Sequence, residues 1–238
     1  PTPKIIGEPI RLKLDQINMD EVWTMIDKKS LFKLSWGLRG KAGAESEEEH
    51  EQLLTEWKIR IIRDKLIEPE VVYGYFKCHN AGQKLLVENP SGDDVEFDFP
   101  RSTKPEHLCL TDYFGTDDVV AFQSVTVGTK VSDVLETWND EDKYTDAYYL
   151  HGLAVELAEA LAQWINQKIK SELNLVKGAL RYSWGFPSCP DVSQHHLVWK
   201  LLEPEKSGMT LTESGQIIPE QSTAAIVIHH PDAKYFVI

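Results

Sequence analysis

The sequence predicts a mixed α+β fold with a largely antiparallel sheet. Short runs of β-forming residues gather in residues 71–127, and a long alanine-rich segment follows at residues 140–173. The two kinds of segment do not alternate as a regular βαβ series, which disfavours a parallel sheet. With 238 residues, 42% of them hydrophobic, the chain is long enough to bury a sizeable core.

The first third of the chain favours helices. Residues 1–19 are expected to form a loop that enters a short strand or helix, and residues 19–26 a short helix. Ser46 and Glu49 match the capping box S-x-x-E. Apolar residues then recur at helical spacing, namely Leu53, Leu54, Trp57 and Ile61. We therefore expect an amphipathic helix from residue 47 to about residue 66.

The middle of the chain is rich in strand signals. Asn80-Ala81-Gly82 is a turn signal between two β-rich runs and predicts a hairpin. The last run of this region is nearly continuous in β-formers, so we expect it to be central in the sheet. The expected strands are Val71–Cys78, Lys84–Glu88, Val95–Phe99, His107–Phe114 and Val119–Val127.

The last part of the chain begins with the longest expected helix, from Asp140 to about Leu173. Its leucines fall on one stripe, and its alanines allow neighbouring elements to approach closely. A Gly-, Pro- and Ser-rich loop is expected at residues 178–191, a short helix at residues 194–202 and a strand at residues 224–229.

The composition excludes several classes of function. The formal net charge of −13 disfavours a nucleic-acid partner, because such proteins carry a basic surface. No run of about 18 apolar residues predicts a membrane span. Cys78, Cys109 and Cys189 are far apart and form no CxxC pair, which disfavours a disulfide framework or a zinc site. A reducing, cytoplasmic location is the expectation.

No phosphate-binding loop, dinucleotide fingerprint, nucleophile elbow or HExxH motif is present. His195 is adjacent to His196, and His229 to His230, so neither pair faces one metal from a single helix face. Catalytic metal or nucleophile chemistry would need side chains to converge from distant parts of the chain. An unrelated hydrolase or metalloenzyme therefore stays an alternative that a metal analysis of the purified chain tests.

Residues 178–191 read GALRYSWGFPSCPD and have two interpretations. Two prolines and two glycines fix several backbone dihedral angles, which suits a rigid loop that covers the core. The same segment suits a small-molecule cradle. Arg181 stands among aromatic residues, and a fixed guanidinium can bind a carboxylate through two hydrogen bonds while aromatic faces hold an adenine or a sulfonium.

This segment resembles the R-x-x-x-G-[YF]-P-x-C-P signature of the activation domain of cobalamin-dependent methionine synthase. The resemblance continues downstream in the family's order, at Leu201–Leu202, Gly208–Ser214 (GMTLTES) and His230–Phe236 (HPDAKYF). Less specific matches lie upstream, at Trp36–Lys41, Gly74–Phe76, Leu110–Tyr113 and Leu157–Ala160. The resemblance covers nearly the whole chain.

The resemblance implies a single C-shaped α+β domain over residues 1–238, with a bent, largely antiparallel sheet flanked by helices. It also implies binding of S-adenosylmethionine and docking on the cobalamin domain of methionine synthase, in the same chain or in another subunit. There a flavodoxin-like or other small electron carrier reduces cob(II)alamin, and S-adenosylmethionine methylates the product. The chemistry belongs to the cofactors, so the domain takes part in methyl transfer without a catalytic residue or turnover of its own.

The signature also assigns residues to the ligand. Arg181 is expected to take the ligand carboxylate, the backbone that follows it to take the nucleoside, and the C-terminal aromatic residues to close the pocket. Phe186 is expected near the surface that faces the corrin. The residues expected to contact S-adenosylmethionine are Arg181, Tyr182, Ser183, Gly185, Tyr235 and Phe236.

The sequence departs from the family where acids should meet the ligand's ammonium group. The family carries an acid eight residues before the tryptophan of W-x-L-x-G-K, and here that position is Lys28, with Asp27 one residue earlier. The glutamate expected in the long helix corresponds to Gln167. Asp27 and Gln167 are the candidates for this contact. The alternative function is a docking module that caps a corrinoid protein and has lost S-adenosylmethionine binding.

Overall fold

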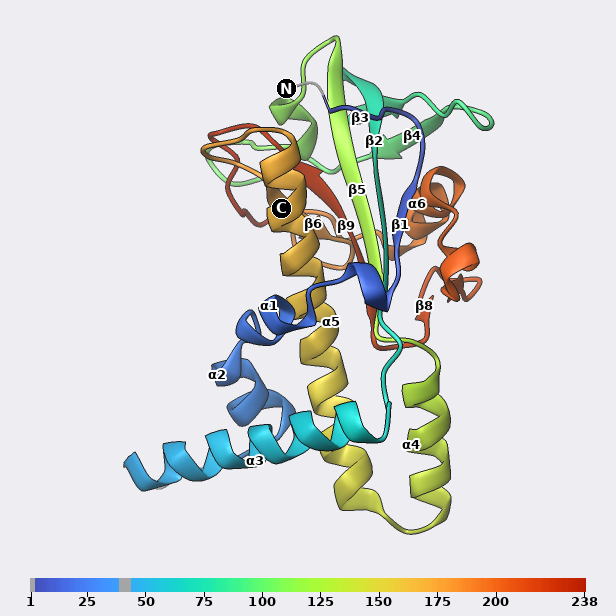
Figure 1. Ribbon diagram of the computed structural model, residues 1–238. Helices are drawn as coiled ribbons and strands as arrows, with labels where there is room; N and C mark the ends of the chain where they lie inside the picture. The colour runs from blue at the N-terminus through green and yellow to red at the C-terminus, as the bar shows by residue number, and fades with distance from the viewer. Residues whose placement is uncertain (1–2, 39–43) are drawn as a thin grey trace.

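The computed structural model describes residues 3–38 and 44–238, and an antiparallel sheet of seven strands forms the centre of this part of the chain (Figure 1). The strand order is β4-β3-β2-β5-β9-β6, and β1 and β3 share one edge of β2 because β5 occupies the other. Strands β7 and β8 form a separate small ribbon. The strands are β1 (Ile10–Leu12), β2 (Glu70–Ala81), β3 (Lys84–Val87), β4 (Val95–Asp98), β5 (Asp118–Thr126), β6 (Leu180–Ser183), β7 (Thr210–Leu211), β8 (Ile217–Ile218) and β9 (Ser222–Ile228).

Helix α5 is the longest helix of the described residues and lies along one face of the sheet, while α6 lies on the other side (Figure 1). The α-helices are α1 (Met19–Thr24), α2 (Lys28–Ser30), α3 (Ala44–Arg63), α4 (Lys130–Asp140), α5 (Tyr144–Glu172) and α6 (His195–Leu202). The short helical turns are η1 (Leu14–Gln16), η2 (Leu31–Ser35), η3 (Leu110–Tyr113), η4 (Val192–Gln194) and η5 (Pro204–Ser207), of which η2 is a π-turn.

The sheet separates two hydrophobic cores, and β2 shows how the sequence produces them. Successive side chains of a strand point to opposite faces. Tyr73 and Tyr75 belong to the core beneath α1, α3 and α5, whereas Val72 and Phe76 belong to the core beneath α6. All four are at most 1% exposed, so both faces of the central sheet are covered.

Glycine allows α5 to approach the N-terminal helical turns. A Cβ atom on Gly152 would lie 2.9 Å from Trp36 Cδ1 and 3.0 Å from the carbonyl oxygen of Ser35. Trp36 is 3% exposed and donates its indole N–H to the carbonyl oxygen of Tyr149, 2.9 Å away. This contact fixes η2 against the middle of α5.

Most expected elements are confirmed, and with them the α+β fold with a curled antiparallel sheet. Strands β2 and β3 form the expected hairpin, in which Gly82 has a φ of +75°. Strand β5 is central, between β2 and β9. Helix α3 begins at Ala44, three residues before the expected start at residue 47.

Three expectations are corrected. The helix expected from Asp140 begins at Tyr144, after a turn in which Asp142 has a left-handed φ of +59°, and α4 before that turn was not expected. Residues 107–114 contain the turn η3 instead of a strand, because the carboxylate of Asp112 accepts the Cys109 N–H at 3.0 Å and replaces a strand partner. The loop expected at residues 178–191 contains strand β6, which pairs with β9.

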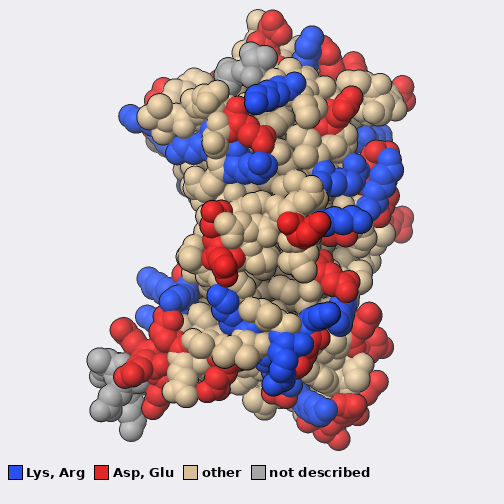
Figure 2. Space-filling view, viewed as in Figure 1, with Lys and Arg blue, Asp and Glu red and all other residues tan. Residues whose placement is uncertain are grey.

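Charge is distributed unevenly over the surface. Figure 2 shows acidic side chains over α3 and over the turn between α4 and α5 at the lower end of the molecule, with basic side chains between them, and an outline that is hollowed at mid-height on the left. Among the helices of the described residues, none combines the length and apolar character that crossing a membrane requires. Three residues of the W-x-L-x-G-K element, Arg39 to Lys41, lie outside the described residues.

Candidate functional site

Strand β6 places Arg181 at the candidate site. β6 pairs with β9, and Arg181 lies opposite Val227. Tyr182 points into the core beneath α6 and is fully buried. Because side chains alternate along a strand, Arg181 and Ser183 share the opposite face, on the side of α5.

A tight loop follows β6 and is closed by its own hydrogen bonds. The Gly185 N–H donates to the carbonyl oxygen of Cys189 at 2.9 Å, and the Cys189 N–H donates to that of Phe186 at 2.9 Å. Gly185 has a φ of +96°, a conformation that favours glycine over residues with a side chain. The loop holds Phe186 at its tip, where the ring is 47% exposed.

The C-terminal segment forms a second wall beside this loop. The Tyr235 hydroxyl donates to the carbonyl oxygen of Arg181 at 3.2 Å, and the Tyr182 hydroxyl donates to that of Lys234 at 2.9 Å. The two tyrosine rings lie 5.1 Å apart between centroids. Ser102 donates its hydroxyl to the carbonyl oxygen of Val237. These contacts fix the segment that carries Tyr235 against β6.

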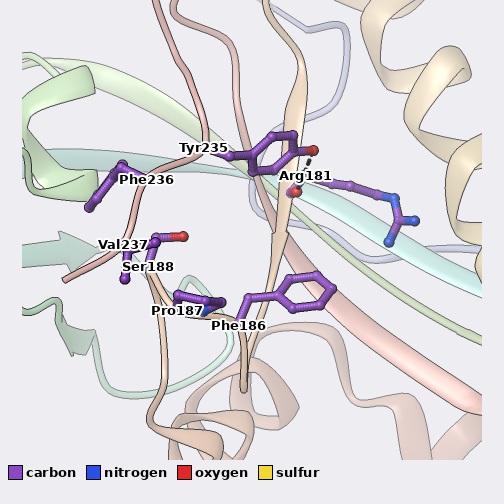
Figure 3. Close-up of a pocket in the computed structure, with 7 residues that line it drawn as sticks. All are labelled: Arg181, Phe186, Pro187, Ser188, Tyr235, Phe236 and Val237. Carbon is purple, nitrogen blue, oxygen red and sulfur yellow. Dashed lines mark hydrogen bonds between the residues drawn. The ribbon is translucent and has the colours of Figure 1, made fainter.

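Between the two walls lies a groove of about 470 Å³, within the size range of small-molecule sites. Figure 3 shows the rings of Tyr235 and Phe186 above and below this space, with the guanidinium of Arg181 extending away from them toward α5. The groove is lined by Arg181, Phe186, Pro187, Ser188, Tyr235, Phe236 and Val237. It therefore combines aromatic faces with one cationic side chain.

The guanidinium of Arg181 is only partly satisfied. Its Nη2 donates to the carboxylate of Glu159 on α5 at 2.6 Å, and its side chain is 15% exposed. Its Nη1 and the Oγ of Ser183 are buried and lack a hydrogen-bond partner within the described part of the chain. Buried polar atoms are usually paired, so these two atoms leave hydrogen-bonding capacity unused on this strand face.

Asp27, the remaining acidic candidate, caps the N-terminus of α2. Its carboxylate accepts the N–H of Ser30 at 3.1 Å and its hydroxyl at 2.8 Å. These hydrogen bonds lower the pKa of Asp27. Asp27 also lies close enough to Glu156 of α5 to contribute to raising the pKa of that carboxyl. The structure thus brings Asp27 to the α5 face that carries Glu159, although the two belong to distant parts of the chain.

The turn η2 accommodates the unusual spacing after Asp27. The N–H of Trp36 donates to the carbonyl oxygen of Leu31, five residues earlier, at 2.7 Å, which is the hydrogen bond of a π-turn. A π-turn holds about one residue more than an α-helical turn. This π-turn lies between Asp27 and Trp36, which are nine residues apart.

The remaining candidate residues have different surroundings. Phe186, Tyr235 and Phe236 line the groove with Arg181. Gln167 is exposed and lies about 12 Å along the α5 axis from Glu159, as eight helical residues imply. The matched Leu157–Ala160 motif contains Glu159 but does not point to a role for it. Its pairing with Arg181 depends on how α5 packs against β6, which that motif does not reveal.

Other reactive groups in the described residues have structural roles. Burial raises the pKa of the Cys189 thiol to about 12, and this thiol donates to the carbonyl oxygen of Ser183 at 3.2 Å. The ring of His195 is buried, with Nδ1 2.7 Å from the carbonyl oxygen of Gly215. Within residues 3–38 and 44–238, no group of three or more His, Cys, Asp or Glu side chains is arranged to hold a metal ion.

Comparison with known families assigns the chain. Residues 18–238 match the family described as vitamin B12 dependent methionine synthase, activation domain. The chain belongs to this family. The resemblance found in the sequence motifs is therefore confirmed, and the activation-domain match covers the groove, the long helix α5 and the N-terminal turns that pack on it.

Individual relatives agree with the family. The chain is 33% identical to the methionine synthase of Mycobacterium tuberculosis and 32% identical to that of Mycobacterium leprae, covering 89% of this chain in each case. It spans about a fifth of each relative, 21% of the length. The fold is that of a solved structure, the crystal structure of the MetH reactivation domain bound to AdoHcy. The TM-score is 0.84 at 20% identity, covering all of this chain and 82% of that one.

Proposed function

We propose that this activation domain binds S-adenosylmethionine in the groove beside Arg181 and docks on a cobalamin domain to support reductive methylation of cob(II)alamin. The observation that carries the proposal is the partly satisfied guanidinium of Arg181 at the wall of an aromatic groove. S-adenosylmethionine supplies the methyl group when bound. The protein's contribution is to bind and orient it, which requires no acid–base pair.

The carboxylate of the ligand fits Arg181. The Nη2 atom of the guanidinium already donates to Glu159, while Nη1 is buried and unpaired. A carboxylate that accepts from Nη1 would satisfy it with a charge-assisted hydrogen bond. The hydroxyl of Ser183, on the same strand face, is also buried and unpaired.

The ammonium group of the ligand fits the acids of α5 and α2. The carboxylate of Glu159 lies beside Arg181 and is 41% exposed, so a ligand can reach it. Asp27 lies at the same face of α5 and keeps its negative charge over a wide pH range because Ser30 lowers its pKa. We propose Glu159 and Asp27 as the ammonium contacts, in preference to Gln167.

The aromatic walls fit the nucleoside and the docking surface. The rings of Tyr235 and Phe236 line the groove, and Tyr235 is held in place by its hydrogen bond to the backbone of Arg181. Exposed apolar side chains at the rim, Phe186 and Val237, suit contact with the corrin or with its protein domain. We further propose that residues 1–238 act as one unit, and that a flavodoxin-like or other small electron carrier supplies the electron.

Equilibrium titration with S-adenosylmethionine tests the binding. The wild-type chain is expected to bind S-adenosylmethionine, and Arg181→Ala and Arg181→Lys are each expected to weaken binding about tenfold or more. Alanine removes the charge and the hydrogen-bond donors, and the ammonium of lysine does not reproduce the guanidinium fork. Arg63→Ala on α3 is the matched control, since it removes an arginine from an exposed ion pair with Asp64. Circular dichroism spectra that match the wild type exclude misfolding as the cause.

The same titration distinguishes the proposed function from a second candidate, a docking module that does not bind S-adenosylmethionine. The exposed rim residues Phe186, Tyr235 and Val237 are the observation that favours it. A wild-type chain that binds the cobalamin domain but no S-adenosylmethionine, with or without that domain present, supports this candidate. Undiminished binding by Arg181→Lys would contradict the role proposed for Arg181.

A further inference from the structure

One face of α5 connects the two sides of the proposed site. Gly152, Glu156 and Glu159 follow one another at spacings of four and three residues, so they lie on the same face of the helix. Gly152 contacts the backbone of Ser35, Glu156 accepts the Ser35 hydroxyl at 2.8 Å, and Glu159 pairs with Arg181. Glu156 therefore lies between the N-terminal turns and β6, and the binding proposal above gives it no role.

The surroundings of Glu156 are negative. Its carboxyl is half-buried, and its pKa is raised by burial and by the carboxylates of Asp27 and Glu159, while the hydrogen bond from Ser35 opposes this shift. Arg181 is directed to Glu159 instead of to Glu156. No ion pair of the described residues includes Glu156, so its negative charge is not neutralised by a basic side chain of the described chain.

A cationic group of a bound ligand would neutralise this uncompensated charge. Two buried atoms at the site, Arg181 Nη1 and Ser183 Oγ, are unpaired, and the side chain of Ser183 is 6% exposed. This is an observation independent of the acids that also indicates a polar ligand. S-adenosylmethionine carries a carboxylate, an ammonium and a sulfonium. With the carboxylate on Arg181 and the ammonium on Glu159 and Asp27, the sulfonium is the ligand charge that still lacks a partner.

We propose that Glu156 is a specificity-determining residue of this site, whose negative charge favours the sulfonium of S-adenosylmethionine over the neutral thioether of S-adenosylhomocysteine. This inference rests on the proposed function, because it concerns the same ligand. The two ligands share the carboxylate, the ammonium and the nucleoside, so those contacts do not distinguish them. Long-range attraction by a carboxylate acts on the one charge that differs.

The test compares the dissociation constants of both ligands for the full 238-residue chain and for Glu156→Gln. The substitution keeps a side-chain oxygen for the Ser35 hydroxyl and removes only the charge. The preference for S-adenosylmethionine is expected to fall by a factor between about two and thirty. This range is the effect of removing one unit charge placed about 8 Å from the sulfonium, for effective dielectric constants between 80 and 20. Affinity for S-adenosylhomocysteine is expected to change less than the affinity for S-adenosylmethionine.

Two further variants separate charge from structure. Glu136→Gln removes one carboxylate from an exposed position on α4 and is expected to leave the preference unchanged. Ser35→Ala removes the hydrogen bond to Glu156 but keeps its charge, so the preference should persist. In the wild type the preference should decrease as the pH falls through the raised pKa of Glu156, and this part of the pH profile should be absent in Glu156→Gln.

The outcomes are distinguishable. If neither ligand binds to the wild-type chain, the proposed function itself fails. If both ligands bind and Glu156→Gln keeps the wild-type preference and pH profile, the function stands and the role of Glu156 is refuted. A preference that falls equally in Ser35→Ala and in Glu156→Gln would also overturn the inference, because a structural contact would then explain it.

Discussion

The close contact between α5 and η2 predicts the effect of substituting Gly152 by alanine. Alanine favours a helix over glycine by about 1 kcal/mol, so an open site would become more stable. Here the new Cβ would lie 2.9 Å from Trp36 Cδ1 and 3.0 Å from the carbonyl oxygen of Ser35. Neither group moves easily, because one belongs to a buried indole and the other to the backbone.

The expected magnitude follows from these opposing effects. Overpacking of a core contact costs about 1–3 kcal/mol, which exceeds the helical gain by about 1 kcal/mol on average. For a chain of 238 residues this corresponds to a decrease in Tm of about 2 to 4 °C. The same displacement would move the N-terminal turns that follow Asp27, a proposed ligand contact, so we also expect weaker binding of S-adenosylmethionine.

Thermal unfolding followed by circular dichroism, together with urea titration, measures the change for Gly152→Ala. Gly115→Ala is the control, because its Cβ would meet nothing closer than 3.8 Å, at Asp118 Oδ2. It is expected to be neutral or stabilising by about 0.5 kcal/mol through the unfolded state. A Gly152→Ala variant that is more stable than the wild type by the full helical gain would refute the packing argument.

Two further predictions concern Asp118 and Phe186. Burial alone would raise the pKa of Asp118, but hydrogen bonds from His229 and from the N–H groups of Gly115 and Val119 lower it to about 2. Because the folded pKa lies below the unfolded value of about 3.9, Asp118 contributes about 2 kcal/mol at neutral pH. This contribution is lost as the pH falls from about 5 to 2. Asp118→Asn should therefore lower the free energy of unfolding at pH 7 and flatten its decline in acid, whereas an unchanged urea-unfolding profile between pH 7 and pH 2 would contradict this prediction. Phe186→Ala removes a half-exposed ring from the groove's rim, so we expect weaker binding to the cobalamin domain at an unchanged Tm, and unchanged binding would argue against a corrin-facing role.

The sequence motifs contain most of the residues that line the groove. The signature at residues 181–191 and the C-terminal HPDAKYF segment carry Arg181, Phe186, Tyr235 and Phe236, which line one groove in the structure. A tight, Pro-bounded loop leaves its backbone few alternatives, so its residues can be interpreted directly.

Residues on long elements were harder to place. The family pattern pointed to Gln167 in α5 and not to Glu159, the carboxylate that pairs with Arg181 about two turns earlier. Consecutive turns of a helix have the same local pattern, so spacing alone does not reveal which turn faces β6. The π-turn of η2 between Asp27 and Trp36 was also not expected from the sequence, and Trp36 beside it is held by its hydrogen bond to α5.

The sequence by itself determined the α+β class, the hairpin, the central strand β5 and the family, because these follow from local patterns of apolar residues, turn residues and motifs. The tertiary structure alone decided that β6 exists as a strand, that Arg181 pairs with Glu159, and that Asp27 lies near enough to Glu156 of α5 to influence its pKa. Each of these depends on contacts between residues far apart in the chain. Such contacts are fixed by how the helices pack on the sheet, a property that no local pattern encodes.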